Sequence, residues 1–241
     1  MTDNKEVRTS EHYVAYLDFM GTKEIVNKDT DDKYLKEIND IYNLAVNFVN
    51  KINLFDDKKT FIKIFSDNIL IAEEITENSK LNRDNLERIC SCCCAIQHFA
   101  LKKGHLVRGT ILKDKFFYNE IFVYGKALLN AVKIEGKGAF YPRIVAKQDI
   151  FKNASSYFSQ YQEDGYFFLN MFMYSQDLDT AIYRNKLLEN LKLNKSNERA
   201  VQNIIWVIMK YNSFFSYMNK ELKRYPSFEP INDKEIKDIL G

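Results

Sequence analysis

Apolar residues recur along the chain at spacings that predict strands and helices. Strand-like apolar runs cover residues 13–20, 61–72, 106–112, 143–146 and 166–170. Helical spacing is found over 33–52, 81–102, 126–135 and most of 181–222. The first helix shows one clear apolar face, formed by Leu35, Ile38, Ile41, Tyr42, Ala45, Phe48 and Val49. Gly104 is expected to end the second helix.

The order of these elements predicts the fold class. It is strand, helix, two strands, helix, strand, followed by a short helix and a late strand. This order indicates an α+β fold with a split βαβ, ferredoxin-like βαββαβ core, in which the 61–72 hairpin belongs to the antiparallel centre. We expect a catalytic domain over 10–165 and a strand and helical C-terminal extension over 166–241 that packs on it. The apolar stripe of that extension indicates packing rather than a cofactor site.

Two aspartates each end an apolar strand-like run. Asp18 follows the first run, and Asp67 lies at the tip of the 61–72 hairpin. On a ferredoxin-like core these two elements are neighbours, so the carboxylates would lie side by side. A carboxylate that ends an apolar strand is costly unless a cation lies against it. The pair therefore predicts a site for two divalent ions, Mn²⁺ or Mg²⁺. The alternative is that Asp18 caps a helix and Asp67 is an ordinary turn residue.

Composition excludes some classes of function. The 241 residues carry 35 basic and 33 acidic side chains, a formal net charge of +2, which argues against a nucleic-acid-binding protein. No apolar run approaches the roughly 18 residues of a membrane span, so no membrane association is expected. The polar N-terminus does not resemble a signal peptide. A soluble, cytoplasmic protein is the expectation.

The four cysteines are grouped at Cys90, Cys92, Cys93 and Cys94. They are too close together to bridge one another within a helix. Cys94 and His98 share a helical face, but a metal site would need a second pair of ligands elsewhere. The favoured interpretation is that the thiols are small buried apolar groups in a reducing compartment.

Four segments in order resemble the class III nucleotide cyclases: 17–21, 65–67, 107–111 and 125–135. More narrowly, they resemble the pyrimidine cyclases of bacterial Pycsar antiphage systems, as do 141–144, 164–167 and the helix carrying Trp206, Tyr211 and Asn212. The resemblance covers roughly residues 10–220. It implies a class III cyclase core and a homodimer with active sites at the interface. It also implies that a nucleoside triphosphate is converted to its 3′,5′-cyclic monophosphate and pyrophosphate.

The resemblance also implies roles for the residues around the two aspartates. Asp18, Asp67 and the backbone carbonyl of Phe19 would bind the metal ions. The backbone N–H groups of Phe19, Met20 and Gly21 are expected to approach the substrate phosphates, because glycine permits a close approach.

Two helix positions that hold an asparagine and an arginine in ordinary class III cyclases are Leu129 and Lys133 here. Lys133 would act catalytically across the dimer interface, although lysine lacks the bidentate fork of arginine. Arg108 is a second catalytic candidate. Both Arg108 and Arg143 could either contact phosphate or form an ordinary ion pair.

The positions that read adenine in adenylate cyclases are Phe61 and Phe122 here, which argues against ATP. The resemblance implies a pyrimidine substrate, UTP first and CTP second. The product would be a second messenger in antiphage defence, sensed by a separate effector. The alternative is a catalytically silent nucleotide-binding sensor, to which the changes at Leu129 and Lys133 would point. A polymerase-like or diguanylate-cyclase enzyme would need a Gly-Gly-Asp/Glu-type turn, which 66–68 does not provide.

Overall fold

The computed structural model describes residues 7–27, 29–52, 60–138, 141–152, 154, 161–163 and 165–241. Asp164, part of one cyclase-like segment, lies outside them. The strands are β1 (Ser10–Phe19), β2 (Phe61–Phe65), β3 (Asn68–Glu74), β4 (Val107–Tyr118), β5 (Val123–Tyr124), β6 (Ile144–Ala146), β7 (Tyr161–Glu163) and β8 (Tyr166–Phe168). The helices are α1 (Thr22–Val26), α2 (Lys33–Ile52), α3 (Ser79–Lys103), α4 (Lys126–Gly138), α5 (Gln148–Phe151), α6 (Asp177–Leu193), α7 (Glu198–Leu222) and α8 (Asp233–Leu240).

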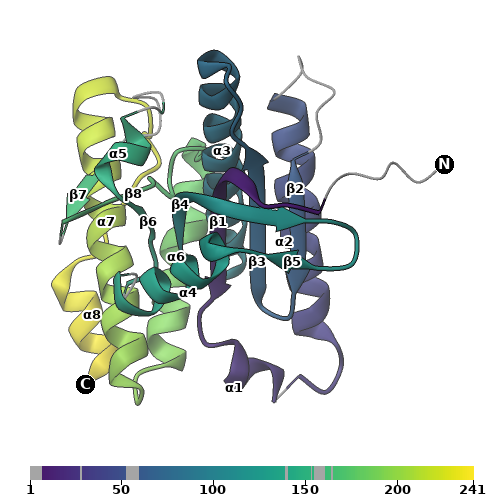
Figure 1. Cartoon of the computed structure of the whole chain (residues 1–241). Helices are drawn as coiled ribbons and strands as arrows, with labels where there is room; N and C mark the ends of the chain where they lie inside the picture. Colours follow the sequence, from purple (N-terminus) through teal and green to yellow (C-terminus); the bar gives the residue numbers. More distant parts are fainter. Residues whose placement is uncertain are drawn as a thin grey trace.

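The strands of the described residues form one sheet in the order β2-β3-β1-β4-β6-β8-β7, with β5 paired to β4 (Figure 1). The first four strands are mutually antiparallel and have the ferredoxin-like order. The predicted α+β fold and its βαββαβ core are therefore confirmed. β6 extends this core by pairing parallel to β4.

Helices cover both faces of the core sheet, and the alternation of side chains along β1 shows which residues face which layer (Figure 1). Tyr13, Ala15 and Leu17 belong to the apolar core shared with α2 and α3. Val14 packs on the opposite face with residues of α4. By the same period of two, Asp18 lies on the α4 face of the sheet.

The C-terminal helices form a second apolar cluster that is rich in aromatic rings and also includes residues of β6, β8 and α3. α6 is tied to α3 by an ion pair between Lys102 Nζ and Asp179 Oδ1 at 2.7 Å, and by a 2.6 Å hydrogen bond between Tyr183 and His98. The helical stretch predicted over 181–222 is interrupted, because Asn197 caps α7 by accepting from the N–H of Ala200. The β7–β8 hairpin lies across the expected boundary at 165/166, and the domain division stays a prediction.

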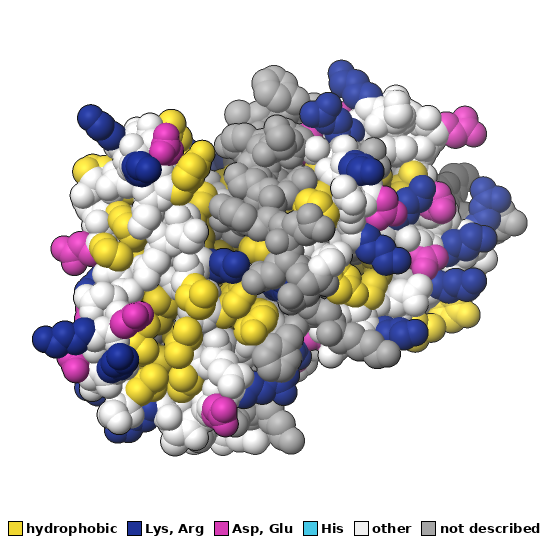
Figure 2. All heavy atoms as spheres, turned by 90° about the vertical axis from the view of Figure 1, so that its left-hand side faces the viewer, with side chains coloured by type: hydrophobic (Ala, Val, Ile, Leu, Met, Phe, Trp, Pro, Cys, Tyr) yellow, Lys and Arg dark blue, Asp and Glu magenta, His cyan; other side chains and the backbone are white. Residues whose placement is uncertain are grey.

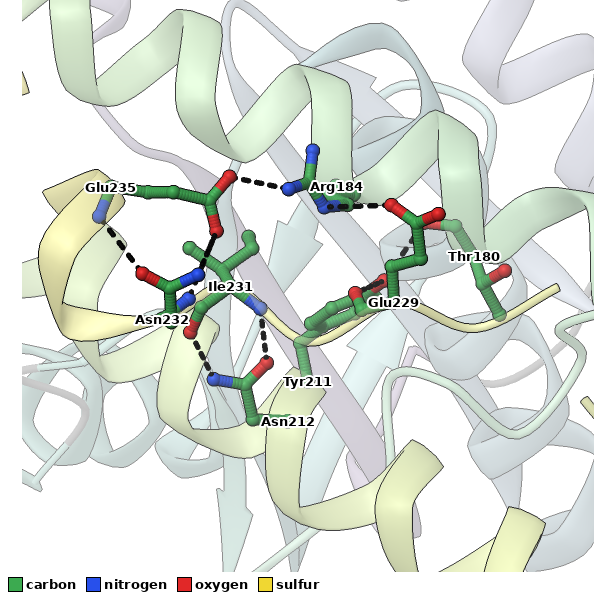
Figure 3. A network of polar contacts seen from close by, with 8 residues as sticks. All are labelled: Thr180, Arg184, Tyr211, Asn212, Glu229, Ile231, Asn232 and Glu235. Carbon is green, nitrogen blue, oxygen red and sulfur yellow. Dashed lines mark hydrogen bonds and ion pairs between the residues drawn. The ribbon is translucent and has the colours of Figure 1, made fainter.

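The last part of the chain is fastened to α6 and α7 by a polar network (Figure 3). The side-chain amide of Asn212 donates to the carbonyl of Ile231 at 2.7 Å and accepts from its N–H at 2.9 Å. Tyr211 donates to the carbonyl of Glu229 at 3.0 Å, and Arg184 pairs with Glu235. These contacts hold α6, α7 and α8 together as one layer.

The face formed by α7 and α8 carries hydrophobic side chains among dispersed charges (Figure 2). Met209 and Tyr217 of α7 contribute to the exposed apolar surface. On the coloured part of this face the basic side chains are not gathered into the stripe that is typical of nucleic-acid binders. None of the helices that the structure describes combines the length and apolar character needed to span a bilayer.

All four cysteines are buried in α3 without disulfide bonds, as the packing interpretation expects. Burial raises the pKa of each thiol, that of Cys92 to about 12. No group of three or more His, Cys, Asp or Glu side chains that could hold a metal ion occurs among the described residues. All four cysteines belong to the apolar core that α3 shares with α2 and the sheet, which fits the packing interpretation.

We expect the protein to lose stability as the pH falls through the range in which histidine titrates. Burial lowers the pKa of His12, His98 and His105 below the usual 6.5. Just below pH 6.5 the histidines of the unfolded chain bind more protons than those of the folded chain. The free energy of unfolding therefore decreases as the pH is lowered. Urea midpoints measured between about pH 7.5 and about pH 5.5 test this. His98→Gln keeps an acceptor for Tyr183 and should reduce the slope. A midpoint that stays constant or rises as the pH falls would contradict the prediction.

Candidate active site

The end of β1 and the tip of the β2–β3 hairpin are joined by a backbone hydrogen bond. The N–H of Phe19 donates to the carbonyl of Asp67 at 3.1 Å, and Asp18 lies opposite Asn68 in the β1–β3 register. A two-residue turn, in which Ser66 has a φ of 57°, presents Asp67 at the hairpin tip. Asp18 and Asp67 are thus held at one end of the sheet, close enough for the charge of Asp67 to raise the pKa of Asp18.

A short hydrogen-bond chain orients the carboxylate of Asp67. The hydroxyl of Tyr16 donates to Asn68 Oδ1 at 2.5 Å, and Asn68 Nδ2 donates to Asp67 Oδ1 at 3.0 Å. The sequence analysis did not identify Tyr16 and Asn68 as site residues. The signal was available, because Tyr16 is two residues before Asp18 and therefore on the same strand face.

Arg108 lies opposite Asp18 on β4 and connects it to α4. Its Nε and Nη2 atoms are each 2.9 Å from Asp18 Oδ2, and Nε is 2.5 Å from Glu135 Oε1. All three side chains are mostly buried. The ion-pair role of Arg108 is thus realised in this chain, and its contact with substrate phosphate stays a prediction. Glu135, which α4 brings to the site, was missed by the sequence analysis because only the tertiary fold places it there.

The carboxyl groups of Asp18 and Glu135 are harder to ionise in this site than in water, because the pKa of each is raised. Burial is the main cause of the raised pKa of Asp18, Asp67 raises it further, and Arg108 opposes both. Burial likewise raises the pKa of Glu135, against the effect of Arg108 and with that of Asp18. Carboxylates that are costly to ionise together are an environment in which a bound cation is stabilising.

The oxygen atoms present fit the predicted divalent ions. Asp18 and Asp67 offer carboxylates, and the Phe19 carbonyl accepts a 2.7 Å bond from Thr22 but keeps a second lone pair. An all-oxygen donor set suits Mg²⁺ or Mn²⁺. Because these are two carboxylates and one carbonyl, water or substrate oxygens would complete the coordination.

Two backbone N–H groups at the end of β1 and in the turn that follows already donate hydrogen bonds within the fold. The N–H of Phe19 bonds to Asp67, and the N–H of Met20 donates to the carbonyl of Leu106 at 2.9 Å. The ring of Phe19 is buried in the core. Gly21 has a φ of 81° with open space where a Cβ would stand. The expected phosphate contact from this turn is therefore left as a prediction for Gly21.

Three further candidates lie on β2, at the β4–β5 hairpin and on α4. Phe61 stacks on Tyr118, with ring centroids 4.0 Å apart, and packs against the α4-side core. Phe122 is at the β4–β5 hairpin and is 47% exposed. Lys133 is exposed on α4. Their roles in base reading and catalysis stay predictions.

A cleft of about 720 Å³ opens beside Asp18 and Arg108. Its walls are the turn at Met20–Gly21, the loop between α3 and β4, the first residues of α2, and the junction between α6 and α7. This volume is in the range of small-ligand sites. The sequence did not predict the cleft, because its walls come from distant parts of the chain.

The chain matches no family model, and no curated protein is significantly similar to it. Among solved structures, it is similar to the monomeric guanylyl cyclase domain of the RhoGC fusion protein from Blastocladiella emersonii, with 14% identity, a TM-score of 0.49 and coverage of 67% of this chain and 96% of that one. It is also similar to the guanylate cyclase domain of RhGC from Catenaria anguillulae in complex with GTP, with 12% identity, a TM-score of 0.48 and coverage of 67% of this chain and 96% of that one. A third similar structure is that of a class III adenylyl cyclase-like ATP-binding protein from Pseudomonas aeruginosa, with 11% identity, a TM-score of 0.43 and coverage of 63% of this chain and 36% of that one. Because these identities are 14% or less and the TM-scores are below 0.5, function has to be argued from the residues of this chain.

Proposed function

We propose that the protein is a metal-dependent nucleotide cyclase that converts a nucleoside triphosphate to its 3′,5′-cyclic monophosphate and pyrophosphate. The observation that carries the proposal is the hydrogen bond from Phe19 N–H to the Asp67 carbonyl. It joins the two strand ends and holds Asp18 and Asp67 at one end of a ferredoxin-like sheet, with an all-oxygen donor set. The oxygen donors favour Mn²⁺ or Mg²⁺, and two such ions are proposed.

Bound divalent ions would lower the pKa of the ribose 3′-hydroxyl and neutralise charge on the triphosphate. The chain's own part is to hold the reacting groups in place. The Tyr16–Asn68 chain fixes the orientation of Asp67. Arg108, whose Nε and Nη2 are engaged by Asp18 and Glu135, would supply positive charge toward which charge on the α-phosphoryl group can develop. The 3′-oxygen loses its proton to water and forms a bond to the α-phosphorus, while the bond from that phosphorus to the pyrophosphate oxygen breaks.

We propose that the active form is a homodimer. Exposed apolar side chains lie on two consecutive elements: Leu129 and Val132 on α4 are 73% and 46% exposed, and Ile121 and Tyr124 at the β4–β5 hairpin are 84% and 67% exposed. Apolar groups gathered at a surface are typical of an interaction site. Lys133 neighbours Val132 on α4, so a dimer through this surface would carry Lys133 toward the partner's site.

The proposed substrate is a pyrimidine nucleoside triphosphate, UTP first and CTP second. Its support is the replacement of the adenine-reading lysine and aspartate by Phe61 and Phe122, neither of which can donate or accept the corresponding hydrogen bonds. The cyclic product would then be a second messenger in antiphage defence, sensed by a separate effector.

The alternative is a silent, nucleotide-binding sensor. The observation that favours it is Leu129, a 73% exposed apolar residue at the position expected to hold an asparagine. Leucine cannot make the hydrogen bonds of that asparagine.

The test is to incubate the purified protein with Mn²⁺ and each of the four ribonucleoside triphosphates, and to separate the products by chromatography. Cyclic UMP is the expected main product. Asp67→Ala should abolish it, whereas Asp84→Ala, which removes an exposed carboxylate of α3, should not. No cyclic product from any substrate would reject the cyclase and favour the sensor. Product that survives Asp67→Ala would show that the metal site is elsewhere, and cyclic AMP as main product would contradict the reading of Phe61 and Phe122.

A further inference from the structure

Arg108 lies between two carboxylates that come from different elements of the fold. It is directly opposite Asp18 in the register of β1 and β4, and directly opposed residues point to the same face of a sheet. Glu135 reaches the same guanidinium from α4, which packs on that face. The exposed fraction of the side chain is 22% for Arg108, 17% for Asp18 and 10% for Glu135. One cation therefore serves two mostly buried carboxylates.

The hydrogen bonds of Arg108 are directed to Asp18 and not to Glu135. Nε donates to Asp18 Oδ2 at 2.9 Å, and Nη2 is 2.9 Å from the same oxygen. Glu135 Oε1 is 2.5 Å from Nε, but it has no hydrogen-bond partner among the described residues. The Nε atom of a guanidinium carries a single hydrogen, so it cannot be directed to both carboxylates at once. Glu135 is thus a buried acceptor that still lacks a directed donor.

A divalent ion at Asp18 would change the balance between these two carboxylates. Asp18 is one of the proposed metal-binding groups, and an ion bound to it neutralises its charge and repels the guanidinium. Glu135 keeps its charge and becomes the stronger partner of Arg108. Asp18 and Arg108 both line the cleft of about 720 Å³, which gives an ion access and the guanidinium room to turn.

We propose that Arg108 and a divalent ion are alternative partners of Asp18, and that Glu135 is the positioning residue that holds Arg108 once the ion has taken its place. Arg108 then weakens metal binding, because the ion has to displace it. Glu135 strengthens metal binding, because it accepts the displaced guanidinium. This inference rests on the proposed function, since it deepens the assignment of Asp18 as a metal ligand.

The test is the binding of Mn²⁺ alone to the full chain, without nucleotide, measured by electron paramagnetic resonance and by water-proton relaxation. Arg108→Gln should bind Mn²⁺ about tenfold more tightly and Glu135→Gln about tenfold more weakly, the size expected for one charge-assisted hydrogen bond. Asp67→Ala added to Arg108→Gln should abolish the gain, which places the ion at the aspartate pair. Glu11→Gln is the matched control for Glu135→Gln, because it makes the same change at a side chain that is 55% exposed.

A double variant separates this exchange of partners from a general effect of charge. Removing a positive charge near a metal site strengthens metal binding by itself, and removing a negative charge weakens it. If Glu135 acts through Arg108, however, Glu135→Gln should change the Mn²⁺ affinity by less than about threefold once Arg108 is glutamine. Simple additivity of the two single effects would overturn the inference. Glu135→Gln leaves Arg108 paired with Asp18, so an unchanged affinity of this variant is decisive even where Arg108→Gln folds poorly.

The outcomes are distinct from those that decide the proposed function. Tighter, Asp67-dependent Mn²⁺ binding by Arg108→Gln supports the inference even where no cyclic product is made from any triphosphate. In an active enzyme, Glu135→Gln should also raise the Mn²⁺ concentration that gives half the maximal rate. Cyclic product from the original chain, together with an unchanged Mn²⁺ affinity in both Arg108→Gln and Glu135→Gln, would overturn the inference and leave the cyclase function standing.

Discussion

Asp18→Asn is expected to lower the rate of cyclic-nucleotide formation on the order of 10²- to 10³-fold, the effect typical of removing a group that stabilises transition-state charge. The substitution keeps the shape of the side chain but removes the negative charge needed to bind a divalent ion. Arg108 keeps Glu135 as its ion-pair partner, so no buried charge is left alone. Turnover with Mn²⁺ and the preferred triphosphate measures the effect.

Glu11→Gln provides the matched control for this prediction. Glu11 lies on the same strand and undergoes the same carboxylate-to-amide change, but its side chain is 55% exposed and pairs with Lys113. Its activity should equal that of the original chain. Equal activity of Asp18→Asn and Glu11→Gln would show that Asp18 is a structural residue only. Thermal unfolding of both variants excludes a general loss of fold.

Phe215→Ala is expected to lower the free energy of unfolding by about 3–5 kcal/mol, the usual cost of deleting a buried phenylalanine ring. Phe215 is fully buried at the centre of the aromatic cluster between α6 and α7. Its ring centroid is 4.8 Å from that of Tyr225 and 5.1 Å from those of Phe172 and Tyr211. The cavity would lie where several rings meet, and these neighbours cannot all move into it. Urea unfolding followed by circular dichroism measures the loss.

Tyr217→Ala is the control for the aromatic cluster. Tyr217 is two residues further along α7 and is 64% exposed, so its removal should change the free energy of unfolding by less than about 1 kcal/mol. If Phe215→Ala were no more destabilising than Tyr217→Ala, the aromatic cluster would not be what holds α6 and α7 together.

The core could be predicted from local patterns, because each of its elements carries its own periodicity. The helix expected at 33–52 has those bounds, and Gly104 ends α3 with a φ of 89°, as a glycine after a helix often does. The short elements β5, β7, α1 and α5 and the last helix, α8, were not predicted. A few residues rarely show a period, although the equally short β6 and β8 were anticipated from the runs at 143–146 and 166–170. The strand expected at 106–112 is longer in the structure, where β4 continues to Tyr118.

Some features of the candidate site could likewise be predicted from the sequence, and others could not. The approach of Asp18 to Asp67 follows from strand order alone, which is why the sequence could suggest it. The contact of Arg108 with Glu135 and the cleft at α6–α7 depend on tertiary packing between segments far apart in the chain. Neither has a local signature. The break before Asn197 was also hidden, because the apolar stripe continues on both sides of it.

The buried cysteines of α3 have a practical consequence. A thiol reacts with alkylating reagents through its thiolate, and burial suppresses that form at all four positions. The folded chain should therefore resist maleimide labelling without any cysteine being replaced. A single cysteine introduced at an exposed position, such as Lys192→Cys on α6, would then take up a fluorophore selectively. Slow labelling at the native positions would report how often α3 opens to solvent.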